Sequence, residues 1–108
     1  MFVRKRPVKM DGLEVEVGPL MCGEADEFLA KQAECLASSP PDLKKLEHAH
    51  YQFVCDGYNN ANPDAKMTVE RLRAEFDKVF IDEMLREIQA MSGLAPKGEA
   101  RSPSASRN

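Results

Sequence analysis

The chain has 108 residues, a net charge of −3, 43% hydrophobic and 31% charged residues, which suits one globular domain. The first nine residues are basic and the body, residues 10–94, is strongly acidic. An acidic body is a poor surface for phosphates, so nucleic acid is not an expected partner. No apolar run reaches the length that crosses a membrane, so we expect no membrane association.

Residues 1–18 predict a β-hairpin. Asp11-Gly12 favours a two-residue type I′ turn, in which both central residues have positive φ. The turn places Lys9 opposite Glu14, which is a favourable cross-strand pair. Pro7 lacks an amide donor and therefore belongs on an edge strand. A lone hairpin is marginal in water, so its apolar face must cover the helices or another subunit. This face supplies the candidate self-association residues: Val8 opposite Val15 and Met10 opposite Leu13.

Residues 23–94 predict three to four helices. The first begins near Gly23 and stops at Ser38-Ser39-Pro40-Pro41. Its predicted apolar stripe contains Ala25, Phe28, Leu29, Ala33 and Leu36. The second begins near Asp42 and ends around Gly57, before an Asn-rich stretch, residues 59–64, that is typical of a loop. Its predicted apolar positions are Leu43, Leu46, His50, Phe53 and Val54.

The last helical region begins near Thr68, which is a good N-cap. Its apolar positions form almost a complete band. That width indicates either burial from two sides or a kink near Phe76-Asp77 that divides a short helix from a longer one. The glycine stop at Gly93 ends the region, and the polar residues 95–108 predict a disordered tail. The expected fold is therefore mainly α with an N-terminal β-hairpin (α+β), as one domain over residues 1–94.

Residue types that carry chemistry lack a recognisable spacing. His48 and His50 lie two residues apart on a predicted helix, so they point about 200° apart and cannot share a metal. We expect one to be half-buried and the other exposed. The three cysteines, Cys22, Cys35 and Cys55, are an odd number without C-x-x-C spacing, which predicts reduced thiols. We expect no enzyme activity, no cofactor and no metal.

The order of the parts resembles the small tail assembly chaperones of long-tailed bacteriophages. The hairpin return Met-Asp-Gly-Leu-Glu-Val-Glu-Val, residues 10–17, is followed by Gly18-Pro19-Leu20 and by an acidic helix start, residues 24–28. The closing helix ends Ile-Gln-Ala-Met-Ser-Gly-Leu, residues 88–94, before the polar tail. The resemblance lies in this pattern rather than in one diagnostic motif, and residues 40–66 do not contribute to it.

The resemblance implies a protein that binds the tape-measure protein, keeps it soluble and helps to recruit tail-tube subunits. It implies self-association into a homo-oligomer and a location in the host cytoplasm, outside the mature virion. A tape-measure protein exposes long apolar helix faces, which an apolar stripe could cover. The candidate protein-binding residues lie on the closing helix: Val79, Phe80, Met84, Ile88 and Met91.

Two alternatives remain open from the sequence. The residues on the closing helix suit a hydrophobic core as well as a binding face. The protein could also be a structural, connector or regulatory interaction protein of a phage, with Arg4-Lys5-Arg6 contacting nucleic acid.

Overall fold

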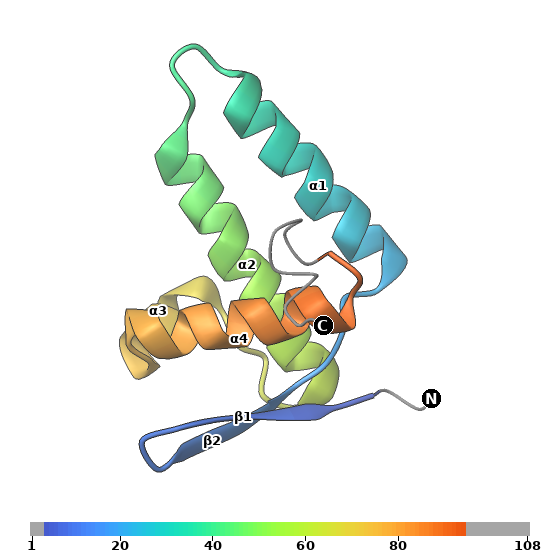
Figure 1. Ribbon diagram of the computed structural model, residues 1–108, viewed down its shortest axis with the longest axis vertical. Helices are drawn as coiled ribbons and strands as arrows, with labels where there is room; N and C mark the ends of the chain where they lie inside the picture. The colour runs from blue at the N-terminus through green and yellow to red at the C-terminus, as the bar shows by residue number, and fades with distance from the viewer. Residues whose placement is uncertain (1–3, 95–108) are drawn as a thin grey trace, which may run out of the picture.

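The computed structural model describes residues 4–94, and its elements follow the predicted order (Figure 1). An antiparallel hairpin is followed by four helices: β1 (Arg6–Met10), β2 (Leu13–Val17), α1 (Cys22–Ala37), α2 (Leu43–Ala61), α3 (Val69–Glu75) and α4 (Lys78–Met91). This confirms the predicted mainly α fold with an N-terminal β-hairpin. The predicted disordered tail, residues 95–108, lies outside the described residues.

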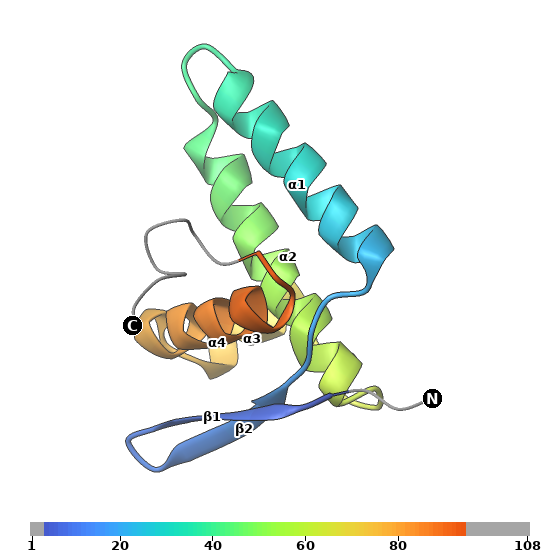
Figure 2. The ribbon, with the colours of Figure 1, turned by 45° about the vertical axis from the view of Figure 1, so that its right-hand side comes forward.

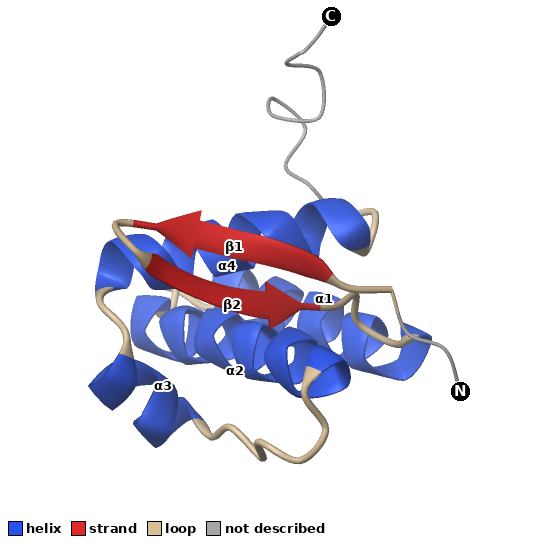
Figure 3. Cartoon of the chain, turned by 90° about the horizontal axis from the view of Figure 1, so that it is seen from below, coloured by secondary structure: helices blue, strands red, loops and turns tan. Residues whose placement is uncertain are grey.

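The β-hairpin has the predicted turn and register. Asp11 and Gly12 both have positive φ, 53° and 86°, as a type I′ turn requires. All the predicted cross-strand pairs are present, including Val8 with Val15 and Met10 with Leu13. The strands lie across α4 and the end of α2 (Figure 3). The Gly18 amide donates to the Gly57 carbonyl at 2.9 Å, which joins the end of β2 to α2.

Helix α2 is longer than the sequence indicated, because Gly57 lies inside it rather than at its end. A Cβ on Gly57 would fall 2.5 Å from Cδ1 of Ile88, so glycine is what lets α4 approach α2. The first half of the Asn-rich stretch, residues 59–61, forms the last turn of α2, and only residues 62–64 belong to the predicted loop. The amides of this stretch bond to the chain around the hairpin: Asn60 donates to the Pro19 carbonyl at 2.9 Å and Asn62 to the Glu16 carbonyl at 2.8 Å.

The last helical region divides where a kink was expected. The Thr68 side chain caps α3 by accepting from the Arg71 amide at 3.2 Å. The Asp77 carboxylate caps α4 by accepting from the Phe80 amide at 2.8 Å. Two separate caps fix two separate helices. The break at Phe76-Asp77 is therefore confirmed, and α4 is also covered by both α2 and the β-hairpin.

One hydrophobic core joins the hairpin, α2, α3 and α4. Its largest fully buried side chains are Phe53, Phe80, Leu72, Met84 and Ile88. Helix α1 contributes little to this core, because it packs mainly against α2. We call α1, the loop 38–42 and α2 the helical hairpin. Its loop end projects away from the rest of the molecule (Figure 2).

Candidate interaction surfaces

The candidate binding residues on α4 are mostly in the core. Phe80, Met84, Ile88 and Met91 are buried, with exposed fractions of 6% or less. Val79 differs, with 60% of its surface exposed. The core alternative therefore holds for four of the five residues in the isolated chain, and Val79 alone of the five is open on α4. The sequence left both readings open because the same stripe suits either α2 and the hairpin or a partner.

The apolar face of the β-hairpin covers the helices rather than an open surface. Val8 is buried, Met10 and Val15 are half-buried against the core, and Leu13 is exposed near the turn. Of the four candidate self-association residues, Leu13 is thus the most accessible. The structure follows the alternative in which the helices of the same chain cover this face.

Two of the basic residues near the start of the chain bind α4. The Arg4 guanidinium donates to the Met91 carbonyl at 2.9 Å. Arg6 forms an ion pair with Glu87 at 2.8 Å. A cation at the C-terminal end of a helix is also favoured by the helix dipole. These contacts give Arg4 and Arg6 a role in holding the hairpin on α4, so they do not favour the nucleic-acid alternative.

Three leucines on the helical hairpin are exposed, and we call them the leucine surface: Leu29, Leu36 and Leu43. Their exposed fractions are 43%, 52% and 66%. Leu29 and Leu36 are two turns apart on the same face of α1, and Leu43 begins α2 on the other side of the loop. The sequence analysis counted Leu29 and Leu36 in the apolar stripe of the first helix and Leu43 among the apolar positions of the second. The buried face of α1 is narrower than the predicted stripe and contains Phe28 and Cys35, because α2 is the main neighbour of α1.

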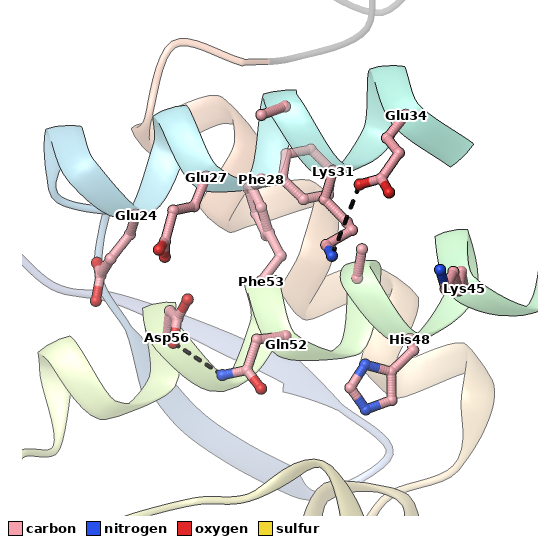
Figure 4. A pocket seen from close by; sticks show the side chains of 12 residues that line it. Glu24, Glu27, Phe28, Lys31, Glu34, Lys45, His48, Gln52, Phe53 and Asp56 are labelled. Carbon is pink, nitrogen blue, oxygen red and sulfur yellow. Dashed lines mark hydrogen bonds and ion pairs between the residues drawn. The ribbon is translucent and has the colours of Figure 1, made fainter. Parts of the chain in front are cut away.

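A groove of about 620 Å³ runs between α1 and α2 (Figure 4). Its apolar floor contains Phe28, Ala49 and Phe53, and the two phenyl rings meet edge to face at 4.6 Å between centroids. Glu27 and Leu29 are two residues apart on α1, so the groove and the leucine surface lie about 200° apart around the helix. The helical hairpin therefore carries two distinct surfaces.

The charges along the groove are unevenly distributed. Glu24, Glu27 and Asp56 lie at one end, and Lys45 lies at the other with His48 and with Glu34, which pairs with Lys31 (Figure 4). Burial raises the pKa of Asp56, and the charges of Glu24 and Glu27 raise that pKa further. A hydrogen bond from Gln52, 3.1 Å long, partly offsets these effects. The acidic end of the groove therefore favours a positive charge.

Neither histidine nor cysteine forms a recognisable reactive centre in residues 4–94. His50 is half-buried and His48 exposed, as predicted. Burial, and then the charge of Lys78, lowers the pKa of His50. Burial also raises the pKa of the Cys55 thiol to about 11, which disfavours the reactive thiolate. Within the described part of the chain, His, Cys, Asp and Glu nowhere form a group of three that could hold a metal ion.

Across residues 4–94, no helix combines the length and hydropathy that a bilayer-spanning segment needs. No protein-family model, curated protein or solved structure matches this chain.

Proposed function

We propose that this protein is a phage tail assembly chaperone that binds the tape-measure protein through the leucine surface of its helical hairpin. Binding keeps the tape-measure protein soluble in the host cytoplasm while tail-tube subunits are recruited. The chaperone self-associates along its target and leaves before the virion is complete. The proposal joins the sequence resemblance to a surface that the fold leaves open.

The exposed leucines are the observation that carries the proposal. Leu29 and Leu36 repeat at the spacing of two helical turns, so an apolar stripe on another helix could pack along them. Complete burial of a leucine contributes about 1.5–3 kcal/mol. A partner that covers these half-exposed leucines would gain a large part of that burial free energy. The body of the protein does not need these side chains, because its own core is already closed by α4.

The first test is the DNA on both sides of the gene. The proposal expects a tail-tube gene upstream, a long coiled-coil reading frame downstream, and a slippery run at the Ala95-Pro96-Lys97 codons. Such a run would allow the reading frame to slip and give a longer product. A bacterial housekeeping neighbourhood without these elements would reject the phage assignment.

The second test is co-expression with the protein from that long downstream reading frame. The native chain should keep the long protein in the soluble fraction and co-purify with it. The double variant Leu29→Gln/Leu36→Gln should weaken the complex at least about tenfold, because two apolar contacts are lost. Glutamine keeps a good helix propensity, so the variant should remain folded.

The matched control is Val79→Gln/Leu13→Gln, which removes two exposed apolar side chains from α4 and the β-hairpin. Their exposed fractions, 60% and 44%, resemble those of the leucines. We expect this control to bind like the native chain. Loss of binding in the control, with binding retained in the leucine variant, would move the interface away from the helical hairpin.

A further inference from the structure

The groove on the other side of the helical hairpin offers a second and independent surface. It combines an apolar floor with an acidic end and with an end where Lys45 lies near the Lys31–Glu34 ion pair. We propose that this groove binds an amphipathic helix from a partner protein. The basic residues of that helix lie against Glu24, Glu27 and Asp56, and its acidic residues lie against Lys45. This inference does not depend on the proposed chaperone function.

The floor suits a helix because it lies between two antiparallel helices. A third helix placed over such a pair packs its apolar side chains between their ridges, at about 8–10 Å between axes. The largely buried rings of Phe28 and Phe53 form the floor, and the small side chains Ala30 and Ala49 leave room beside them. An apolar stripe of leucine-sized side chains would fill the space that the groove leaves open.

The charges along the groove determine which charged residues the partner helix needs. Glu27 and Asp56 come from α1 and α2 and lie at the same end of the groove (Figure 4). Lys31, the cation nearest the middle, is already paired with Glu34 at 3.8 Å. A lysine or arginine from the partner would offset the repulsion among the carboxylates at the acidic end.

The charges also set the direction of the helix. A helix is stabilised by acidic residues near its N-terminus and basic residues near its C-terminus. Its N-terminus therefore belongs beside Lys45 and its C-terminus beside Asp56, so it runs parallel to α2. These two residues are eleven positions apart along α2, or about 16 Å. The opposite charges on the partner should be separated by a similar number of residues.

Two synthetic peptides test the inference with the full chain. Each is a helix of about 18 residues with leucines at i, i+3, i+4 and i+7. One has glutamates in its first turns and arginines in its last turns, and the other has these charges exchanged. Fluorescence anisotropy should give about tenfold weaker binding for the exchanged peptide, because two charge pairs become repulsive. Amide chemical shifts of the chain should move at Ala49, Gln52 and Phe53.

The matched test exchanges the charges on the protein. Glu27→Lys/Lys45→Glu alters two exposed side chains, and the preference between the peptides should largely disappear, because Glu24 and Asp56 keep their end acidic while the Lys45 end loses its positive charge. This arm also separates groove binding from any difference in helix content between the peptides. A second variant, Asp56→Asn on α2, should weaken binding of the first peptide. Asp26→Asn removes a charge from α1 outside the groove lining and should leave this binding unchanged.

Four results would overturn the inference. The first is that neither peptide binds. The second is that Glu27→Lys/Lys45→Glu prefers the first peptide as strongly as the native chain does. If that double variant does not fold, the same result in Asp56→Asn would count instead. The third is a set of shifts centred on Leu29 and Leu36, which would place the peptide on the leucine surface. Shifts at the groove that appear on concentrating the chain alone would identify a second copy as the occupant, and would also reject a partner helix.

Discussion

The two ends of the helical hairpin are built differently. Near its C-terminus, α2 crosses α4 so closely that Gly57 has no room for a side chain beside Ile88. Near the loop, Leu36 and Leu43 are more than half exposed, and α1 packs mainly on α2. The crossing holds the fold together, whereas the projecting end is free to bind. Substitutions at the crossing should therefore change stability, and those at the projecting end should change binding.

The largest expected effect comes from a charge in the core. Met84→Asp places a carboxylate at a fully buried position on α4. An unpaired buried charge costs several kcal/mol, and a domain of this size is stable by about 5–15 kcal/mol. We expect a loss of about 4 kcal/mol or more, seen as a lost cooperative transition in circular dichroism melts.

Val79→Asp is the control for Met84→Asp, because it makes the same kind of change on the same helix. Val79 is exposed, so we expect the free energy of unfolding of its variant to lie within about 0.5 kcal/mol of that of the native chain. A folded Met84→Asp protein that fails to bind its partner would restore α4 as the binding face.

A smaller effect is expected where α2 crosses α4. Gly57→Ala improves helix propensity by about 1 kcal/mol. It also places Cβ within 2.9 Å of three side-chain atoms of Ile88, and such overpacking costs about 1–3 kcal/mol. We expect a net destabilisation of about 1 kcal/mol in urea unfolding, because the branched Ile88 cannot move all three atoms away.

Gly23→Ala is the matched control, since an added Cβ there meets nothing within 4 Å. It should stabilise the protein by about 0.5–1 kcal/mol. Adding Ile88→Val to Gly57→Ala should recover part of the loss, with a coupling of at least about 0.5 kcal/mol. If Gly57→Ala and Gly23→Ala stabilised the protein equally, the contact between α2 and α4 would be less tight than the structure shows.

Local signals predicted the elements that local chemistry determines. Asp11-Gly12 fixed the turn and thereby the whole register of the β-hairpin. Thr68 marked the start of α3, and the kink considered near Phe76-Asp77 lies where α4 starts. At both positions a side-chain oxygen accepts from a backbone amide in the first turn. Each of these features depends on residues at most eleven positions apart, so the local sequence contains the necessary information.

Features that depend on which elements meet could not be predicted in the same way. Gly57 looked like a helix end, but its role comes from Ile88, which is 31 positions away in the chain. The apolar stripes of α1 and α4 looked alike, yet α4 has neighbours on several sides and α1 has mainly α2. For the same reason the groove was missed, because its acidic end combines carboxylates from two helices.

The smallest expected effect comes from this acidic end. Burial raises the pKa of Asp56 above its ordinary value, so the folded state binds the proton more tightly than the unfolded state. The ionised side chain therefore costs stability at neutral pH, and the cost disappears as pH falls through the raised pKa. Asp56→Asn removes the cost and keeps an oxygen that can accept from Gln52. We expect a gain of about 0.3–0.5 kcal/mol at neutral pH, after allowance for solvent screening.

Urea unfolding between about pH 4 and pH 7 would measure this gain. The difference between Asp56→Asn and the native chain should shrink toward the acidic end of the range, whereas Asp26→Asn should show little difference throughout. A gain that grows as pH falls would contradict the assignment. Because Asp56→Asn should stabilise the fold yet weaken helix binding in the groove, the two measurements have opposite signs. Unfolding cannot produce that combination. The acidic end of the groove would then be shown to lower the stability of the fold and to strengthen helix binding.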